Sequence, residues 1–331
     1  MKQERISIIG DGGWGTTLAV HLCKKGHLAS LWGAFPENIK EIKKTKINQK
    51  FLPGIKIPNN LVLHESLKEA IAFSDLIVLA VPSQYLKSIL KKIKKTNISQ
   101  KTFLSVVKGV DTSSLERMSE LIYKELGSVK LAVLSGPTIA IEVAKGIPST
   151  AVIASHNTKL AKNIQSIFNS TTFRIYTNSD IVGVELGGSI KNIIAIACGV
   201  CDGLGFGTNT KAAIVSRGLI EMSRLAKVLG GKTKTLSGLS GLGDLVTTCF
   251  SPKSRNRFVG EQLGQGISLK KIMSSMSMVA EGVPTAKGIY RLSVKHNISM
   301  PIATEVYKII YRNKKPSLAV KDLMSRRMKS E

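Results

Sequence analysis

A glycine-rich turn near the start of the chain constrains the fold more than any other feature. The apolar, β-branched stretch 6–9 runs directly into Gly10, and the turn reads Gly-Asp-Gly-Gly-Trp-Gly as far as Gly15. An amphipathic stretch typical of a helix follows at 16–25. In such a unit Gly10 permits the tight turn, Gly12 lets the backbone approach a pyrophosphate, and Gly15 lets the helix pack on the strand. The helix N-terminus then offers N–H groups to an anion. The turn therefore predicts a fold that holds a dinucleotide.

The rest of the chain divides into two patterns. Up to about residue 178, short apolar runs alternate with amphipathic stretches, which is typical of βαβ units and a parallel sheet. The expected strands are 5–9, 28–32, 76–81, 102–107, 131–135, 150–154 and 173–177, and the helices between them include 85–95, 115–126 and 160–168. Beyond that point helical periodicity dominates, at 181–201, 209–229, 269–276, 285–296 and 302–311. We therefore expect the α/β class: an N-terminal Rossmann-type doubly wound sheet (1–178), then an all-helical C-terminal domain (179–331) that carries the substrate and catalytic groups.

The chain carries an unusually large positive net charge. It has 48 Lys and Arg against 22 Asp and Glu, a net charge of +26. A nucleic-acid surface would interleave basic and aromatic side chains, but aromatic residues make up only 5% of the chain. We expect a Lys-rich protein that attracts phosphorylated ligands and binds no nucleic acid. A basic nucleic-acid-binding protein is the alternative from a different class.

The cysteines and the apolar runs indicate the compartment. The four cysteines are Cys23, Cys198, Cys201 and Cys249. They form no disulfide framework, and the Cys-x-x-Cys pair has no second pair to complete a zinc site, so we expect core residues and no metal. The first strand begins at about Arg5, which leaves no signal peptide, and no apolar run approaches the length of a membrane span. These features predict a soluble, cytoplasmic protein without stable membrane insertion.

Lys191 is unusual because it falls on a small, apolar helical face. Its neighbours at three and four positions are Gly187, Gly188, Ile194 and Ala195. One interpretation is a lysine whose stem packs while its head reaches water. The other is a buried lysine, whose pKa falls on desolvation toward a range useful for proton transfer. The sequence favours the two equally.

Two further groups carry polar chemistry in the helical half. Asp244 follows a Gly-x-Gly bend and precedes an apolar stretch, so it could cap a helix or orient Lys191. Ser254, Arg255 and Asn256 offer a hydroxyl, a fork of donors and an amide, a set that suits a phosphate group. A solvated basic turn is the alternative for these three.

Two expected strand ends also carry candidate residues. Lys108 follows the strand 102–107, and Gly136 and Thr138 follow the strand 131–135. In open α/β sheets, ligands bind at the carboxyl ends of the strands. These residues are therefore candidates for ligand contacts.

Six separated segments together resemble the bacterial NAD(P)-dependent sn-glycerol-3-phosphate dehydrogenases. They are residues 10–15, 134–138, 184–192, 241–245, 254–256 and 279–282, and the resemblance covers nearly the whole chain. It implies reversible hydride transfer between NAD(P)H and dihydroxyacetone phosphate, giving sn-glycerol 3-phosphate for phospholipid biosynthesis. It also implies a small-molecule phosphate substrate and no metal, and it leaves room for a homodimer.

The resemblance assigns roles to particular residues. Lys191 would be the proton donor or acceptor at the C2 oxygen, with Asp244 as the second catalytic group. The implied substrate contacts are Lys108, Gly136, Thr138, Lys191, Asn192, Asp244, Thr248, Ser254, Arg255 and Asn256. The implied cofactor contacts are Gly10, Gly12, Gly13, Trp14, Gly15, Lys108, Ala140, Arg255, Val279 and Glu281.

The segment after the second strand departs from the expected pattern. An acidic residue here would bind the ribose 2′-OH of NAD, and an arginine would favour the 2′-phosphate of NADP. This chain has Ala34, which leaves NAD or NADP open and favours NADP or the use of both. A related two-domain β-hydroxyacid dehydrogenase is the nearest alternative, although it has no evident need for residues 254–256.

Overall fold

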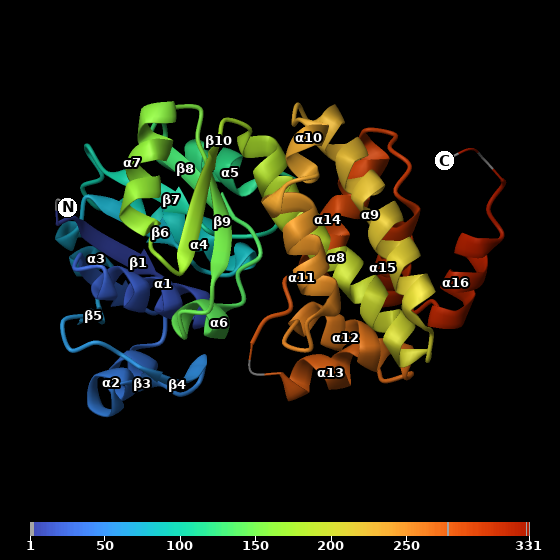
Figure 1. Cartoon of the computed structure of the whole chain (residues 1–331), viewed down its shortest axis with the longest axis horizontal. Helices are drawn as coiled ribbons and strands as arrows, with labels where there is room; N and C mark the ends of the chain where they lie inside the picture. The colour runs from blue at the N-terminus through green and yellow to red at the C-terminus, as the bar shows by residue number, and fades with distance from the viewer. Residues whose placement is uncertain (1–2, 277, 329, 331) are drawn as a thin grey trace. The chain divides into compact units, whose positions relative to one another are not determined.

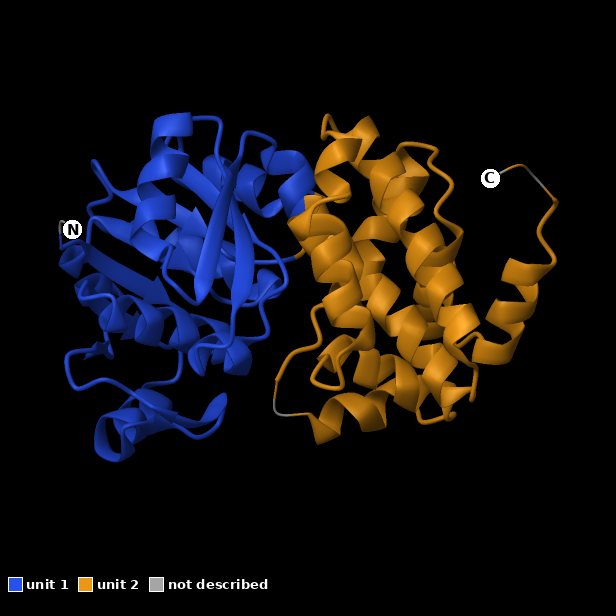
Figure 2. Cartoon of the chain, in the orientation of Figure 1, with its two compact units in different colours: residues 1–108, 116–185 blue, residues 109–115, 186–331 orange. Residues whose placement is uncertain are grey.

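The computed structural model describes residues 3–276, 278–328 and 330 of the chain. The chain forms two compact units, coloured separately in Figure 2. Unit 1 comprises residues 1–108 and 116–185, and unit 2 comprises residues 109–115 and 186–331. The last boundary, between residues 185 and 186, falls inside one long helix, α8 (Ile181–Gly203), rather than in a loop.

Unit 1 is built on an eight-stranded sheet in the order β10-β9-β8-β7-β6-β1-β2-β5 (Figure 1). Its strands are β1 (Arg5–Ile9), β2 (Leu28–Trp32), β5 (Val62–His64), β6 (Leu76–Leu79), β7 (Thr102–Ser105), β8 (Lys130–Ser135), β9 (Ser149–Ala154) and β10 (Phe173–Asn178). All seven strands expected from the sequence are present, with ends that differ by at most two residues. The Rossmann-type prediction is therefore confirmed.

One strand pair differs from the expected parallel sheet. The pairs from β5 through β8 are parallel, as is β9 with β10, but β8 and β9 run antiparallel. The chain between them contains only the five-residue helix α6 (Ala140–Ala144). Residues 136–148 make up the connection, a length close to the minimum of about a dozen residues that a parallel crossover needs. The chain turns back here instead of crossing over.

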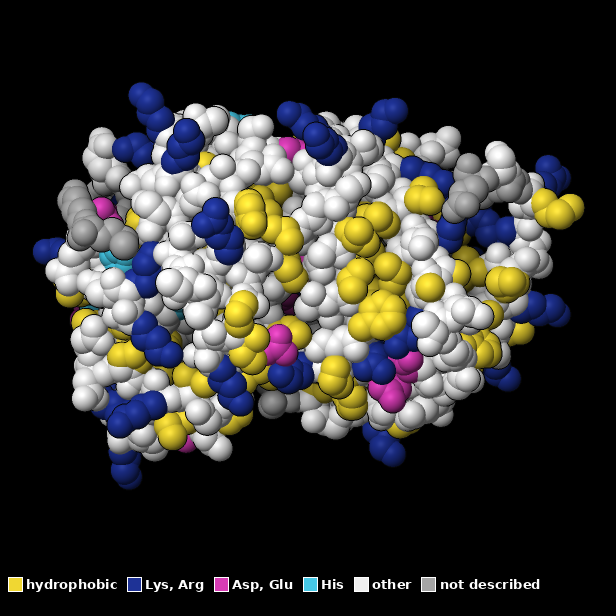
Figure 3. All heavy atoms as spheres, viewed as in Figure 1, with side chains coloured by type: hydrophobic (Ala, Val, Ile, Leu, Met, Phe, Trp, Pro, Cys, Tyr) yellow, Lys and Arg dark blue, Asp and Glu magenta, His cyan; other side chains and the backbone are white. Residues whose placement is uncertain are grey.

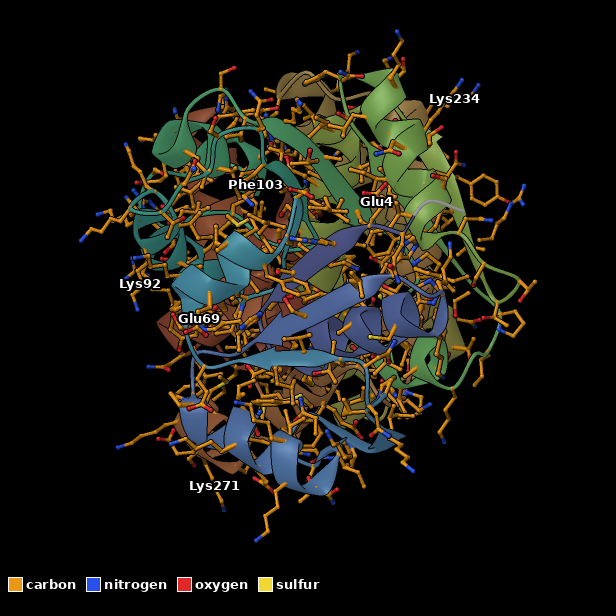
Figure 4. The ribbon with its side chains drawn as sticks, turned by 90° about the vertical axis from the view of Figure 1, so that its left-hand side faces the viewer. Glu4, Glu69, Lys92, Phe103, Lys234 and Lys271 are labelled. Carbon is orange, nitrogen blue, oxygen red and sulfur yellow. The ribbon has the colours of Figure 1, made fainter. Side chains whose placement is uncertain are left out.

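Helices cover both faces of this sheet. They are α1 (Gly13–Lys24), α2 (Pro36–Thr45), α3 (Leu67–Phe73), α4 (Ser83–Ile93), α5 (Met118–Leu126), α6 and α7 (Thr158–Phe168). Alternate strand residues enter two separate cores, so Val78 packs in one and Ile77 in the other. Phe103 lies in the interior, while Glu69 on α3 and Lys92 on α4 point outward (Figure 4).

The sequence did not predict three short strands of unit 1. β5 is three residues long, and β3 (Ile47–Asn48) pairs with β4 (Leu52–Lys56) in a separate two-stranded sheet. β4 contains Pro53 and Gly54, which are depleted in strands. Their local sequence therefore indicates a turn rather than a strand.

Unit 2 is helical. Besides α8 it contains α9 (Thr208–Val228), α10 (Thr233–Leu236), a π-helical turn (Leu239–Gly243), α11 (Asp244–Phe250), α12 (Arg255–Gly264), α13 (Leu269–Ser275), α14 (Gly282–Lys295), α15 (Pro301–Arg312) and α16 (Pro316–Met324). The five helices expected here are all present. The sequence did not predict α10, α11, α12 and α16. The first three are short and lie among glycines, which disfavour a helix locally.

Helices α8 and α12 pack with their backbones in contact. A Cβ atom on Gly199 would lie 1.9 Å from the carbonyl oxygen of Arg257, and one on Gly260 would lie 2.0 Å from that of Ile196. Both distances are far below van der Waals contact. Only glycine fits at these two positions, and the close packing brings the first turn of α12 beside the middle of α8.

α8 also corrects one expectation from the sequence. It has 23 residues with a mean hydropathy of 1.5 in its most apolar window, which is long and apolar enough to cross a membrane. The prediction that no apolar run approaches this length is therefore wrong. However, 94% of that window is buried inside the protein. The hydropathy of α8 is that of a core helix.

Candidate functional site

The glycine-rich turn joins β1 to α1, and the structural reason for glycine differs between its positions. Gly10 has φ +127°, and a Cβ atom on it would lie 2.6 Å from the carbonyl oxygen of Ala80. A Cβ atom on Gly15 would lie 1.9 Å from the carbonyl oxygen of Gly10. The Cβ position of Gly12, in contrast, has nothing within 4 Å. Packing explains Gly10 and Gly15, whereas Gly12 faces open space.

The N-terminus of α1 suits an anion in that space. Gly12 is its N-cap residue, no side chain caps it, and the first turn has no acidic residue. The first N–H groups of a helix have no partners within it, and they carry the positive end of the helix dipole. The turn therefore fits the pyrophosphate of a dinucleotide.

Gly13, Trp14 and Ala140 lie next to each other beside this turn. A Cβ atom on Gly13 would lie 3.8 Å from the Cβ of Ala140, and the hydroxyl of Thr17 donates to the carbonyl oxygen of Ala140 over 3.0 Å. The indole Nε1 of Trp14 is buried and has no hydrogen-bond partner among the described residues. The fold thus gathers three of the expected cofactor contacts around α1.

A second group lies at the carboxyl ends of β7 and β8. The Lys108 ammonium donates to the carbonyl oxygen of Gly136 over 3.3 Å, and the Thr138 hydroxyl donates to the same oxygen over 3.1 Å. Gly136 has φ +147°, and a Cβ atom on it would lie 2.9 Å from the Cα of Ala151. The three expected residues of these strand ends therefore form one cluster.

In unit 2, Lys191 is buried and paired. Only 8% of its side chain is exposed. Its ammonium forms an ion pair with the Asp244 carboxylate and donates to the Thr248 hydroxyl over 2.8 Å. The Thr248 hydroxyl in turn donates to the carbonyl oxygen of Asp244 over 2.7 Å. Of the two interpretations of Lys191, the buried one is confirmed, and the lysine that reaches water is wrong.

Close backbone packing explains why Lys191 and Asp244 meet. A Cβ atom on Gly187, one turn before Lys191, would lie 2.3 Å from the carbonyl oxygen of Ser240. The π-helical turn can therefore lie directly against α8, and Asp244 begins α11 immediately after it. Asp244 is the first residue of α11 and not its N-cap residue, which is Gly243.

Asn192, the residue after Lys191, forms a buried amide pair with Asn256. Asn256 Nδ2 donates to Asn192 Oδ1 over 2.9 Å, and Asn256 Oδ1 accepts from the N–H of Gly282 over 2.9 Å. Asn192 Nδ2 is buried without a hydrogen-bond partner among the described residues. Leaving a buried amide unsatisfied costs about 1–3 kcal/mol. This atom is therefore available as a donor for a ligand oxygen.

The other expected residues surround the first turn of α12. The Ser254 hydroxyl accepts from the N–H of Arg257 over 3.2 Å and so caps the helix. The Arg255 guanidinium donates to the carbonyl oxygen of Val279 over 2.8 Å. Glu281 is the N-cap residue of α14, two residues after Val279. Ser254 thus has a structural role as a helix cap, in addition to the phosphate contact expected from the sequence.

Sequence reasoning missed Asp11, the second residue of the glycine turn. It is 6% exposed, and Asn38 Nδ2 donates to its Oδ2 over 2.6 Å. Burial raises the pKa of Asp11, while the hydrogen bond from Asn38 and the charge of Lys50 act in the opposite direction. An acidic residue between the first two glycines of the turn is the signal that could have found it.

The cysteines are core residues, as expected. All four are free thiols and buried. Burial raises the pKa of Cys201 to about 12, so its thiol stays protonated at neutral pH. Among the residues that the structure describes, no three His, Cys, Asp or Glu side chains are grouped to hold a metal ion.

Comparison with known proteins decides the family. Residues 5–161 match the family model of the NAD-dependent glycerol-3-phosphate dehydrogenase N-terminus, and residues 180–321 match that of the C-terminus. The chain belongs to this family. It is 47% identical over 329 residues to glycerol-3-phosphate dehydrogenase [NAD(P)+] from Prosthecochloris aestuarii, covering 98% of this chain and 99% of that one. The same-named protein of a Thermoanaerobacter species is 46% identical, covering 99% and 98%.

Solved structures agree with this assignment. The crystal structure of glycerol-3-phosphate dehydrogenase from Coxiella burnetii superposes with a TM-score of 0.95 at 37% identity, covering 98% of this chain and 99% of that one. The glycerol-3-phosphate dehydrogenase from Plasmodium falciparum gives a TM-score of 0.87 at 28% identity, covering 99% and 97%. The family expected from the sequence is confirmed over nearly the whole chain.

Proposed function

We propose that this protein is an NAD(P)-dependent glycerol-3-phosphate dehydrogenase that interconverts dihydroxyacetone phosphate and sn-glycerol 3-phosphate. The observation that carries the proposal is the buried ion pair of Lys191 and Asp244, in a chain whose two halves both match the family. Bound nicotinamide supplies the hydride in the reducing direction and accepts it in the other.

Lys191 acts at the C2 oxygen of the substrate. Negative charge grows on this oxygen as the hydride reaches C2, and the ammonium stabilises that charge and delivers the proton. Asp244 and Thr248 hold the ammonium in place through the contacts described above. The burial of Lys191 strengthens its electrostatic effect, because little water competes for the charge.

The phosphate of the substrate is bound away from C2. Arg255 offers a fork of donors at the first turn of α12, and the buried amide pair of Asn192 and Asn256 has a free N–H. Interactions with the phosphate position the carbonyl group for the reaction. We assign the same general role to Lys108, Gly136, Thr138 and Ser254.

The glycine turn binds the pyrophosphate of the cofactor. Gly10, Gly12, Gly13, Trp14 and Gly15 form this part of the site, as the open space over Gly12 supports. Further contacts come from Lys108, Ala140, Arg255, Val279 and Glu281. We place the cofactor domain at residues 1–178 and the substrate domain at 179–331.

The partners and setting follow from the reaction. The substrate is a small phosphorylated molecule, and the product serves phospholipid synthesis. We propose a cytoplasmic enzyme, compatible with a homodimer, that inserts into no membrane and binds no nucleic acid. On the face shown in Figure 3, Lys and Arg side chains are dispersed rather than gathered in one patch. This dispersal supports the proposal that the protein binds no nucleic acid.

The test is a substrate panel followed at the nicotinamide absorbance. Purified protein should oxidise NADH or NADPH with dihydroxyacetone phosphate and not with β-keto acids. Turnover of β-keto acids but not of dihydroxyacetone phosphate would instead identify a β-hydroxyacid dehydrogenase.

A further inference from the structure

Asp11 occupies the place of a side chain that the chain lacks at the end of β2. A Cβ atom on Gly33 would lie 2.4 Å from both Cγ and Oδ2 of Asp11, and 2.8 Å from Oδ1. The carboxyl group therefore fills the volume where a side chain at position 33 would begin. Only glycine at 33 leaves room for it.

Residues 33–35, directly after β2, lie where dinucleotide folds place their ribose-binding acid. Gly33 directly follows β2 and lies 21 residues after Gly12. In Rossmann folds an acidic residue about 20 residues beyond the glycine turn binds the ribose 2′-OH. Here residues 33–35 are Gly-Ala-Phe, with neither an acid nor a base.

The carboxyl ends of β1 and β2 lie close enough together for a side chain that follows β1 to take the place of one that follows β2. β1 and β2 are parallel neighbours with Ile9 opposite Trp32, and the N–H of Gly10 donates to the carbonyl oxygen of Trp32 over 2.8 Å. A side chain from position 11 can therefore reach the end of β2. Asn38, on the first turn of α2, fixes its direction through the 2.6 Å hydrogen bond to Oδ2.

We propose that Asp11 supplies, from the glycine turn itself, the carboxylate that the end of β2 lacks, and that it makes the protein select NAD over NADP. A carboxylate accepts a hydrogen bond from a ribose hydroxyl and repels a phosphate in the same place. This inference rests on the proposed function only in that the turn binds a nicotinamide dinucleotide. It runs against the preference for NADP, or for both cofactors, expected from Ala34.

Because the Asp11 carboxylate is buried, a further hydrogen-bond donor would stabilise its ionised form. Asn38 is the one described side chain that hydrogen-bonds its carboxylate, at Oδ2, and the backbone N–H of Asp11 itself also interacts with it. Desolvation is the largest influence on this group, and it raises the pKa. A second donor such as a ribose hydroxyl would offset part of the cost of burying the ionised form.

Lys50 is the residue that could oppose this selection. Its ammonium lies 5.4 Å from the ring centroid of Phe35 and 5.2 Å from that of Phe51, and its charge acts on Asp11. It is exposed, so it could reach a 2′-phosphate. The experiment must therefore include a variant of Lys50.

Binding of cofactor fragments to the full chain separates these roles without any turnover. Calorimetry with ADP-ribose and 2′-phospho-ADP-ribose should show the unphosphorylated fragment binding at least about tenfold more tightly, a difference of about 1.4 kcal/mol. Asp11→Ala and Asp11→Asn should each narrow this ratio by about tenfold. Asparagine keeps an acceptor for Asn38, so it guards against loss of the loop structure. Lys50→Ala should leave ADP-ribose the preferred fragment.

Glu37→Gln is the matched control, because it removes one negative charge from the exposed first turn of α2. It should leave the ratio unchanged. Tighter or equal binding of the phosphorylated fragment by the unmodified protein would overturn the proposal, as would an equal shift in Glu37→Gln and Asp11→Asn. Preference for ADP-ribose in a protein that does not reduce dihydroxyacetone phosphate would overturn the proposed substrate and support the selectivity.

Discussion

Lys191 precedes Asp244 by 53 residues, and no local pattern requires the two side chains to meet. The apolar face around Lys191 is visible in the sequence, but that face suits a lysine that reaches water as well as a buried one. The contact depends on the approach of Ser240 to Gly187, which is a property of tertiary packing. The sequence therefore identifies Lys191 and Asp244 as candidates, but it does not predict that their side chains are in contact.

Arg255 lies at the first turn of α12, where its fork of donors can bind a phosphate. Arg255→Lys should raise the KM for dihydroxyacetone phosphate about tenfold with a smaller effect on kcat, because lysine cannot form a bidentate contact. Steady-state kinetics measure both constants. Arg257→Lys is the control, since the Arg257 guanidinium pairs with Asp202 at 2.6 Å, and it should leave KM nearly unchanged. A normal KM in Arg255→Lys would remove this role.

His21 on α1 predicts how the stability of the protein depends on pH. Burial lowers its pKa to about 4, and its Nε2 lies 2.7 Å from the carbonyl oxygen of Phe168. The unfolded chain binds a proton near pH 6.5 and the folded one only near 4, so stability falls as pH drops between these values. Near pH 5 the loss should be about 2 kcal/mol relative to pH 8.

Urea unfolding at pH 8 and pH 5 checks this dependence. His21→Gln should lose about 2 kcal/mol less than the unmodified protein over this range. His156→Gln, which changes an exposed histidine, should behave like the unmodified protein. An equal pH dependence in His21→Gln and the unmodified protein would show that His21 is not the group responsible.

Most elements of the fold could be predicted from hydrophobic periodicity, because buried strands and amphipathic helices have strong local patterns. The failures have physical causes. β3 and β5, with two and three residues, are too short for a pattern to appear, and β4 contains Pro53 and Gly54, which indicate a turn. α10, α11 and α12 lie among glycines that read locally as breaks, yet some of these glycines serve close helix packing. The antiparallel pairing of β9 depends on a long-range return of the chain and leaves no local trace.

The contact between α8 and α12 can be tested at Gly199. Alanine inside a helix normally stabilises it by about 1 kcal/mol relative to glycine. Here the added Cβ would lie 1.9 Å from the carbonyl oxygen of Arg257, so Gly199→Ala should instead destabilise the protein by about 2–3 kcal/mol. Thermal unfolding compares it with Gly207→Ala, whose added Cβ meets nothing within 4 Å. A stabilised Gly199→Ala variant would contradict the packing described.

The whole molecule carries a net charge of +26, which could serve either nucleic-acid binding or the attraction of small anions. The sequence predicts no nucleic-acid binding and keeps it as the alternative. The family assignment, and the dispersed basic side chains on the face shown in Figure 3, favour attraction of small anions. Both the cofactor and the substrate are anionic. A positive field raises their rate of encounter with the protein and is screened by salt.

We expect the encounter with substrate to depend on salt, and we expect no binding of nucleic acid. Raising ionic strength from about 20 to about 200 mM should lower kcat/KM for dihydroxyacetone phosphate severalfold while kcat changes little. A gel shift with duplex DNA at physiological salt should show no discrete complex. A stable, salt-resistant complex with DNA would support the alternative class.

Lys191→Met tests whether Lys191 delivers the proton to the C2 oxygen. Methionine keeps an unbranched side chain in the apolar site but removes the charge, and thermal unfolding verifies that the variant is folded. The decisive measurement is kcat for dihydroxyacetone phosphate reduction beside the affinity for NADH. We predict that kcat falls by about 10²–10⁴ while NADH affinity stays within about threefold. A folded variant that keeps kcat within about tenfold of the unmodified enzyme would contradict the claim.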